Sequence, residues 1–473
     1  MKRAAIPLLV VVTCLIACVF VSHRSFWIDE GGTAIRAMMP SLGDWWRMIL
    51  HLRGSDIQMP AYMLYAWLWM QKLGATTEFW LRMSNLPWLL LAVLVLHRIR
   101  FWPVVCLASP FVLYFMDDFR PYVMQISAGA CAAAALGRTI GSAEEKSLKG
   151  IHAVSAACLF LIACSLTGAI WAAGTGIAAA VVRPDWLTNR KAWLHAAPWL
   201  VAALAAAGFY GFTLTQGYRA TEIRDAGVMN VLFGFYEMTG MLGLGPGRNE
   251  IRSNPSCVIA FLPVLVPAAA CIAAAWGIGA VSWARNTPKR SIAAVCVAVA
   301  LPLFLLTAVG ILMDFRVLGR HLSPMIPAVL LPIAASFGAS GRLAIPGRVT
   351  GFAAFLFMAG SALQLRFHHR HDKDDFRTAT GLAIEALRDG RRVWWQADMN
   401  TARYYAFRAG GPQLVNFIQV LESDPPTSIM FADTVFINRP DLYFANGNHE
   451  RLLTDNFFRK IRTFQGFEVW SSD

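Results

Sequence analysis

Charged residues are scarce in this chain: Asp, Glu, Lys and Arg make up 15% of its 473 residues, whereas soluble domains typically carry about 25%. Apolar and aromatic residues make up 56%. A composition this poor in charge excludes an ordinary soluble domain and predicts a polytopic membrane protein. The net charge of +13 does not require a nucleic acid partner, because basic loops facing an anionic cytoplasmic leaflet account for it.

The chain also lacks two features: cysteines placed for disulfides or a metal cluster, and a signal-peptide cleavage site. The nine cysteines lie almost entirely within apolar runs, so we interpret them as small core residues that form neither disulfides nor a metal cluster. The first apolar run, residues 4–22, is followed by His23, Arg24 and Ser25 with no small-residue cleavage site. We therefore expect a retained first helix with a cytoplasmic N-terminus, not a signal peptide.

Basic clusters give the orientation of the remaining spans, because Lys and Arg favour the cytoplasmic side. With these clusters inside, alternation holds along the chain and predicts about 11 membrane helices, an odd number. After the first helix the predicted spans are 83–96, 101–116, 122–136, 151–165, 168–182, 193–209, 258–279, 292–312, 322–337 and 350–365. The membrane part is then 1–365, with a first extracytoplasmic loop at 23–82.

The apolar segment 60–73 is an exception to the alternation. It is short for a crossing, and a crossing would move the basic residues at 97–100 to the outside. We therefore predict an interfacial helix along the outer membrane face.

Residues 366–473 have the composition of a soluble unit and predict a small extracytoplasmic α/β domain. Asp374 or Asp375 is placed to cap a helix that Gly390 ends. Buried strands are expected at 392–397 and 428–432, a further helix at 449–464 and a closing strand at 467–470.

The predicted outward loops are unexpectedly rich in arginine. Guanidinium groups bind phosphate oxygens in a bidentate manner and stay charged, so this surplus suggests anionic ligands. The alternative is that these arginines are solvated or pair with loop carboxylates such as Asp44 and Asp56. The residues concerned are Arg24, Arg36, Arg47, Arg53, Arg82, Arg120, Arg219, Arg224, Arg248, Arg252, Arg316 and Arg320.

An acidic pair, Asp29-Glu30, follows the first apolar run almost directly, behind Trp27 and Ile28. Charge placed where a spanning helix leaves the membrane usually has a function. The alternative is an interfacial aromatic belt with solvated carboxylates.

Six segments, in order, resemble the signatures of the GT-C membrane glycosyltransferases, the group that includes protein O-mannosyltransferases and the aminoarabinose transferases acting on lipid A. The first resembles the aromatic-Asp-Glu signature of the first loop in that group. The six are Phe-Trp-Ile-Asp-Glu at 26–30, Gln-Met-Pro-Ala-Tyr-Met-Leu-Tyr at 58–65, Glu-Phe-Trp-Leu-Arg-Met at 78–83, Asp-Phe-Arg-Pro-Tyr at 118–122, Gly-Arg-His-Leu-Ser-Pro at 319–324 and Asp-Asp-Phe-Arg at 374–377. The chain departs from the pattern at Gln58, Met59 and His321, where the family usually has His, Pro and Tyr.

The resemblance implies an inverting glycosyltransferase that moves a sugar from a polyprenyl-phosphate donor to an extracytoplasmic protein, lipid or glycan. Such chemistry needs a base for the acceptor hydroxyl and cations for the leaving phosphate. We predict Asp29 as the base and Glu30 as a residue that orients a neighbour or binds substrate. The residues expected to hold the donor phosphate are Arg320, His321, Arg120 and Arg82, and those expected to contact substrate from the loops are Gln58, Tyr62, Asp118 and Tyr122.

A divalent cation is not required by this prediction, but it stays an alternative. Asp29, Glu30, Asp117 and Asp118 together offer the oxygen ligands that such an ion prefers. Abundant arginine favours phosphate stabilisation without a metal. Asp117, Asp118 and Arg120 have a second interpretation as a local pair that caps a helix end.

Two other classes of protein compete with the enzyme. A transporter or flippase of polyprenyl-linked sugar would also need apolar helices and phosphate-binding arginines, but transporters tend to carry charge within their spans and to show internal repeats. Here the predicted spans carry almost no charge and no repeat is detectable. A binding protein with an anchored terminal domain would need only one span. Short loops and a compact chain suggest a bacterial inner membrane, with the C-terminal domain periplasmic or extracellular.

Overall fold

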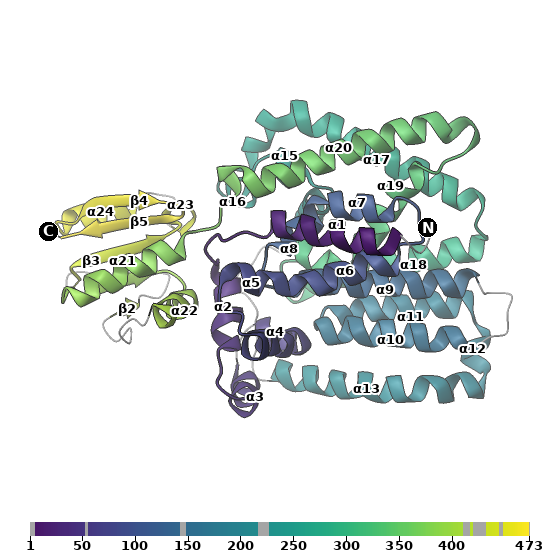
Figure 1. Ribbon diagram of the computed structural model, residues 1–473, viewed down its shortest axis with the longest axis horizontal. Coiled ribbons are helices and arrows are strands. Elements are labelled where there is room, and N and C mark those ends of the chain that lie inside the picture. The colour runs from purple at the N-terminus through teal and green to yellow at the C-terminus, as the bar shows by residue number, and fades with distance from the viewer. Residues whose placement is uncertain are drawn as a thin grey trace.

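Long apolar helices dominate the computed structural model, which describes residues 5–52, 55–141, 148–215, 227–409, 417–419, 432–443 and 448–472. Figure 1 shows a helical bundle with a smaller sheet-containing domain, coloured green to yellow, beyond one end of it. The main bundle helices are α1 (Ala5–Phe20), α6 (Leu86–Val95), α9 (Tyr122–Gly141), α10 (Lys149–Cys164), α11 (Gly168–Val182), α13 (Arg190–Thr215), α17 (Leu262–Arg285), α18 (Lys289–Leu312), α19 (Ile326–Ser336) and α20 (Ala344–Phe367).

Six helical segments among the described residues are long and apolar enough to cross a membrane, and α1, α10 and α11 are shorter apolar helices. Side chains that face away from the bundle are apolar too: Leu204 and Phe304 are 70% and 68% exposed. Exposed apolar surface of this kind needs lipid around it. The chain is therefore an integral, multi-pass membrane protein, while the number of about 11 crossings stays a prediction. The six long segments are Glu78–Val95, Tyr122–Gly141, Arg190–Thr215, Pro255–Arg285, Lys289–Leu312 and Gly341–Phe367.

Small residues let these helices approach closely. A Cβ on Gly174 of α11 would lie 2.3 Å from Cγ of Pro302 in α18, so only glycine fits at this crossing. Figure 1 shows α9, α10, α11 and α13 side by side along the length of the bundle.

The predicted span 101–116 is not one helix. It divides into α7 (Trp102–Ala108) and α8 (Pro110–Met116), because Ser109 caps α8 by accepting from the Val112 N–H and Pro110 begins it. The start of the predicted span 322–337 is likewise the 3-10 helix η4 (Gly319–Met325), which precedes α19. The polar residues after α8 and those of η4 lie at one end of the bundle, where Arg120 and Arg320 both contact Asp29.

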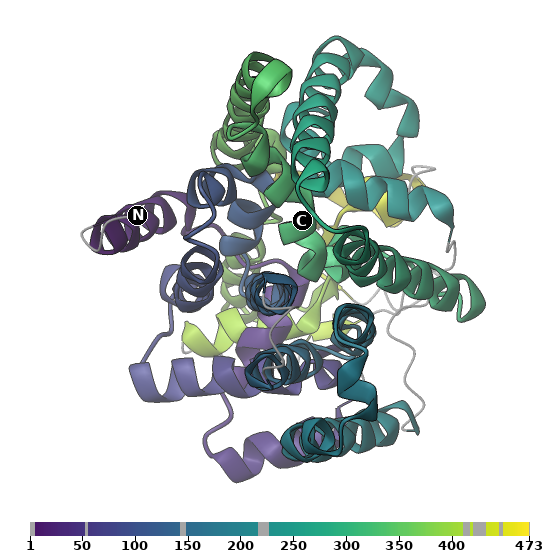
Figure 2. The same ribbon diagram turned by 90° about the vertical axis from the view of Figure 1, so that its right-hand side faces the viewer.

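The first loop is helical and lies at that same end. It contains α2 (Ile28–Ala37), α3 (Leu42–His51), η1 (Ser55–Gln58), α4 (Pro60–Leu73), α5 (Glu78–Arg82) and η2 (Met83–Asn85). The bounds of α4 match the predicted interfacial helix, since Pro60 begins it and Gly74, at φ 65°, ends it. Figure 2 looks down the long helices and shows the purple helices of this loop lying across them.

Among the described residues between α13 and α17, the helices α14 (Val228–Met238), α15 (Met241–Leu244) and α16 (Arg248–Ser253) were not predicted. The predicted span 258–279 begins within η3 (Pro255–Phe261), which precedes α17. Other short helices are α12 (Asp185–Thr188), η5 (Gly341–Leu343) and η6 (His369–His371).

The C-terminal domain contains a five-stranded sheet in the order β2-β1-β3-β5-β4. β1 runs parallel to β2 and β3, and β5 runs antiparallel to β3 and β4. The strands are β1 (Val393–Gln396), β2 (Phe417–Gln419), β3 (Thr434–Asn438), β4 (Arg459–Phe464) and β5 (Phe467–Ser471), and the helices are α21 (Phe376–Arg388), α22 (Met399–Arg408), α23 (Pro440–Tyr443) and α24 (Asn448–Asp455).

The C-terminal domain agrees only in part with what its sequence predicts. Asp375 caps α21 by accepting from the Thr378 N–H, as predicted. The predicted helix 449–464 is wrong in its second half, which is strand β4. Of the predicted strand 428–432, residues 428–431 lie outside the described residues, and the neighbouring strand is Thr434–Asn438.

Candidate active site

Asp29 and Arg320, distant in sequence, meet at the end of the bundle. Asp29 lies in the first turn of α2 and Arg320 in η4. One Arg320 terminal nitrogen donates to Asp29 Oδ2 at 2.9 Å, and the side chains are 19% and 26% exposed. The other Arg320 nitrogens form no hydrogen bond with the described residues. The sequence prediction placed base and phosphate ligand at these two positions, and the fold brings them together.

The charges around Asp29 keep it ionised. Burial raises the pKa of this carboxyl, but the guanidinium groups of Arg120 and Arg320 lower it more, so the net pKa lies below the ordinary value. Arg248 adds to the same effect. Asp29 is thus an ionised carboxylate beside cations that would also attract an anionic substrate.

Glu30 has a different environment from its neighbour. Its side chain is fully buried, and Arg82 binds both carboxylate oxygens, at 2.8 and 2.9 Å. Lys373 donates to Oε2 at 2.9 Å and the Phe119 N–H to Oε1 at 2.9 Å. This arrangement favours a role in orienting neighbours over a direct role in proton transfer.

Arg82 is fully buried beneath the first loop. Besides Glu30, it donates to the backbone carbonyls of Ser22 at 3.1 Å, Arg24 at 2.8 Å and Ser25 at 3.2 Å. With its donors engaged by the protein, Arg82 fixes the chain that leads into α2. A phosphate contact, as predicted, would have to displace these bonds.

Lys373 was missed by the sequence prediction. It lies in the polar linker after α20 and reaches into the bundle, where its ammonium donates to Glu30 and to the carbonyl of Asp117 at 2.6 Å. Its Nζ also lies 3.6 Å from Asp118 Oδ1. The only sequence signal was its position one residue before the Asp374-Asp375 motif.

Asp118 is buried and accepts from Trp27 Nε1 at 3.1 Å. Burial raises the pKa of Asp118 to about 6, because Lys373 only partly offsets the loss of solvation and Glu30 adds repulsion. Asp117 instead accepts from the N–H and the hydroxyl of Ser22, at 2.6 and 2.8 Å. The two aspartates therefore tie the segment after α8 to the chain after α1.

Arg120 is bound in a network of the first loop. It donates to Asp56 Oδ1 at 2.6 Å, to Thr33 Oγ1 at 2.8 Å and to the Asp29 carbonyl at 3.2 Å. Asp56 also pairs with Arg36. Pairing of loop arginines with carboxylates, the alternative raised from the sequence, thus holds for Arg36 and Arg120, and Arg47 pairs with Asp44. Arg53, Arg219 and Arg224 lie outside the described residues.

Arg248 brings a further cation toward Asp29 from the unpredicted α16. Its Nε donates to the buried Glu237 of α14 at 2.8 Å, and Glu237 accepts from the Gly319 N–H at 3.1 Å. Glu237 thereby connects α14, α16 and the start of η4. Arg248 was among the arginines predicted in outward loops, whereas Glu237 was not predicted as a site residue.

His321 is neutral. Burial and the neighbouring Arg320 lower the pKa of its imidazole to about 3. Nδ1 accepts from the Leu318 N–H at 3.0 Å, so Nε2 carries the proton and is the donor available to a ligand. A phosphate contact from His321 would therefore be an uncharged hydrogen bond.

The remaining predicted residues are less exposed to a ligand. Tyr62 is fully buried, with its ring 6.2 Å from that of Phe119. Tyr122 is also buried, 4.5 Å from the ring of Phe115. Gln58 is half-buried, and its carbonyl accepts from the Leu166 N–H at 2.9 Å. Tyr62 and Tyr122 line the core beneath the site, and Gln58 anchors the first loop.

The four carboxylates that the sequence offered to a divalent cation are all engaged by protein donors: Asp29 by Arg320, Glu30 by Arg82 and Lys373, Asp117 by Ser22, and Asp118 by Trp27. Over the described part of the chain, a different set has three ligand atoms within 4.8 Å of one another, namely His449, Glu450 and Glu468 in the C-terminal domain.

The C-terminal domain packs on α2 beside this site. The Tyr405 hydroxyl accepts from the Phe26 N–H at 2.7 Å, and the rings of Phe26 and Tyr404 lie 5.2 Å apart. A Cβ on Gly31 would lie 2.7 Å from the Thr401 backbone, so glycine is needed for α22 to approach α2. The site lies where the domain meets the bundle.

Comparison with solved structures bears on this architecture. No family model matches the chain, and no curated protein sequence matches it. ArnT from Cupriavidus metallidurans in the apo state is similar over 99% of this chain and 98% of that chain, with a TM-score of 0.56 and 12% sequence identity. The same protein bound to undecaprenyl phosphate is similar over 100% and 99%, with a TM-score of 0.54 and 14% identity.

The chain has the GT-C fold. The predicted resemblance is thereby confirmed at the level of the fold, and it extends over the membrane bundle and the C-terminal domain alike, because nearly the whole of both chains is matched. The arabinofuranosyltransferase AftD from Mycobacteria is matched over 100% of this chain and 40% of that chain, with 13% identity and a TM-score of 0.47.

Proposed function

We propose that the protein is a glycosyltransferase that moves a sugar from a polyprenyl-phosphate donor to a hydroxyl of an extracytoplasmic acceptor. The observation that carries the proposal is the ion pair of Asp29 and Arg320 at the end of a membrane bundle. Arg320 has further N–H donors that no described residue binds. The GT-C fold supports the proposal, since one solved structure of that fold contains undecaprenyl phosphate.

In this mechanism Asp29 takes the proton of the acceptor hydroxyl. The acceptor oxygen then bonds to the anomeric carbon, and the bond from that carbon to the phosphate oxygen breaks, with its electron pair leaving on polyprenyl phosphate. Attack and departure on opposite faces invert the anomeric centre. Arg320 and Arg248 stabilise the leaving phosphate by charge-assisted hydrogen bonds.

The ion pair gives a physical reason why donor binding would make Asp29 a stronger base. A low pKa makes Asp29 a weak base while Arg320 holds it. Donor phosphate at Arg320 competes for the guanidinium and brings a negative charge close to Asp29, and both effects raise the pKa of Asp29. The base therefore becomes stronger when the donor is bound.

Sugar transfer in membranes supplied with a polyprenyl-phosphate sugar tests these roles. Asp29→Asn should slow transfer roughly a hundredfold to ten-thousandfold, the usual contribution of a positioned base, and leave donor binding largely intact. Arg320→Ala should weaken donor binding as well as turnover, because its contact exists before and during the reaction.

Matched controls come from the exposed pair on α3. Asp44→Asn and Arg47→Ala make the same chemical changes in the same loop but away from the site, and should transfer sugar as the wild type does. Near-normal transfer by Asp29→Asn would overturn the assignment of the base and direct the search to Asp118 or Glu30.

We also propose that the reaction needs no metal, because Arg320, Arg248 and Lys373 supply positive charge where a cation would act. Transfer should survive prior treatment with EDTA, and Mg²⁺ or Mn²⁺ added afterwards should not stimulate it. Activity lost to EDTA and restored by either ion would contradict this proposal.

A further inference from the structure

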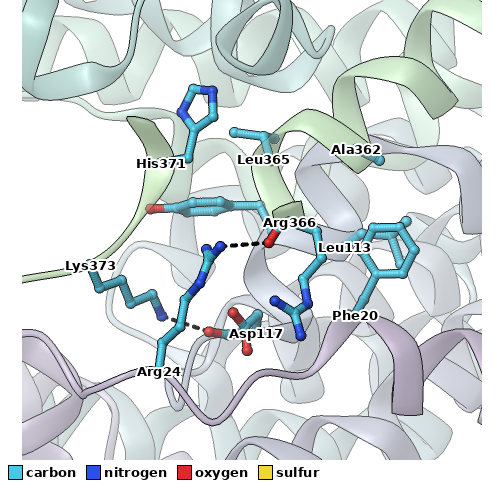
Figure 3. Close-up of a pocket in the computed structure, with 10 residues that line it drawn as sticks. Phe20, Arg24, Leu113, Asp117, Ala362, Leu365, Arg366, His371 and Lys373 are labelled. Carbon is cyan, nitrogen blue, oxygen red and sulfur yellow. Dashed lines mark hydrogen bonds between the residues drawn. The ribbon is translucent and has the colours of Figure 1, made fainter. Parts of the chain in front are cut away.

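A cationic cavity lies at the ends of α1, α8 and α20. The space in it that the centre of a water-sized sphere can reach is about 20 Å³, and the cavity is partly open to solvent. Phe20, Arg24, Tyr114, Asp117, Arg366 and Lys373 are among the residues that line it, and Figure 3 shows the Arg24 and Arg366 side chains turned into the same space. Neither Asp29 nor Arg320 lines this cavity.

Positive charge exceeds negative charge along this lining. Arg24 donates to the Arg366 carbonyl at 2.6 Å and pairs with Asp372 at 2.7 Å. Arg366 donates through Nε to the Val19 carbonyl at 3.1 Å. Its two terminal nitrogens form no hydrogen bond with the described residues. A guanidinium edge is therefore available to a ligand inside the cavity.

Beside residues that line the cavity, α1 and α20 carry exposed apolar side chains. Val19 is 52% exposed, Leu363 50% and Phe367 59%. The rings of Phe20 and Phe367 lie 6.5 Å apart and join α1 to α20. Figure 2 shows α1, marked N, at the edge of the bundle. An acyl chain can pack along this surface while its headgroup reaches the arginines.

We propose that this cavity binds the phosphate headgroup of an anionic membrane lipid at a site separate from the donor site. A guanidinium fork matches two phosphate oxygens. A lone arginine near a helix end commonly extends toward the headgroups, but here Arg366 is bonded to the neighbouring helix and Arg24 and Lys373 converge on the same space. That convergence indicates a formed site.

Native mass spectrometry of the full-length protein in detergent tests the proposal. Dioleoyl phosphatidic acid should bind, whereas dioleoylglycerol, which has the same chains and no phosphate, should not bind at the same concentration. Arg366→Gln should weaken phosphatidic acid binding about tenfold or more, the effect of losing one charge-assisted contact. Arg348→Gln, an exposed change at the other end of α20, should bind as the wild type does.

Further binding experiments distinguish between the possible ligands. Arg320→Ala should keep phosphatidic acid binding, and neither undecaprenyl phosphate nor inorganic phosphate at equal concentration should displace this lipid. Unchanged binding in a folded Arg366→Gln protein, or equal binding of dioleoylglycerol, would overturn the site. Displacement by undecaprenyl phosphate would show that the cavity belongs to the donor, and displacement by inorganic phosphate would show that no lipid is needed.

Discussion

Glu30 and Asp118 share the ammonium of Lys373 but differ in how the fold compensates their charge. Burial raises the pKa of Glu30, yet Arg82 and Lys373 outweigh burial and bring it to about 2. No guanidinium among the described residues pairs with Asp118, so burial prevails and the pKa of Asp118 is about 6. One carboxylate therefore stabilises the folded state as an anion, and the other is better tolerated when protonated.

Replacing each of the two with its amide should have opposite effects. Glu30→Gln leaves Arg82 buried without its counter-ion, which should destabilise the protein by about 3–5 kcal/mol. For Asp118 the folded pKa exceeds the unfolded one, so its contribution to stability is present below about pH 4 and is lost as pH rises to about 6. Asp118→Asn should therefore gain stability relative to wild type over that interval. Melting temperatures of the two variants and the wild type in detergent between pH 4 and 8 measure both effects. Parallel curves of melting temperature against pH for Asp118→Asn and wild type would contradict the expectation for Asp118.

Motifs in the sequence drew attention to some residues of the candidate site. Asp29 and Arg320 belong to two such motifs, and the structure joins them. Lys373 and Glu237 could not be found this way, since each acquires its role from a partner far away in sequence: Glu30 for the lysine and Gly319 for the glutamate. Neither was distinguishable from an ordinary linker or loop charge.

Local signals decided which elements could be predicted. α11 and α4 match their expected bounds because Gly and Pro delimit apolar runs. Strand β4 was taken for a continued helix because its residues, Arg459–Phe464, lack a strong strand pattern and are mostly exposed. Its pairing with β5 decides the conformation, after Phe457 turns the chain at φ 67°. Pairing with a distant strand can override local conformational preference, and a short stretch of sequence does not reveal it.

The placement of α4 along the outer membrane face can be tested with single cysteines. Thr76 follows α4 and Arg98 follows α6, and both side chains are exposed. Because α4 should not cross, Thr76→Cys should react from outside with an impermeant thiol reagent, and Arg98→Cys should react only after the membrane is permeabilised. Protection at Thr76→Cys with outside labelling at Arg98→Cys would show that α4 crosses.

At the scale of the whole molecule, polar elements are divided between the two ends of the bundle. The first loop, η4 and the C-terminal domain gather at one end, as Figure 1 shows. The other end has basic residues flanking the long helices, including Arg285, Lys289 and Arg348. Since Lys and Arg beside spans favour the cytoplasm, the candidate active site is expected on the extracytoplasmic side, where a polyprenyl-linked sugar would meet its acceptor.

Reporter fusions test this orientation for the whole chain. Alkaline phosphatase needs an extracytoplasmic, oxidising compartment to form its disulfides, so a fusion after Asp372 should be active and a fusion after Lys289 inactive. Asp372 pairs with Arg24 near the start of the first loop, so activity there places that loop, with Asp29, on the same side. Immunoblots of both fusions control for expression. The reverse pattern, at equal expression, would place the C-terminal domain and Asp29 in the cytoplasm, and the proposed transfer to an extracytoplasmic acceptor would then be wrong.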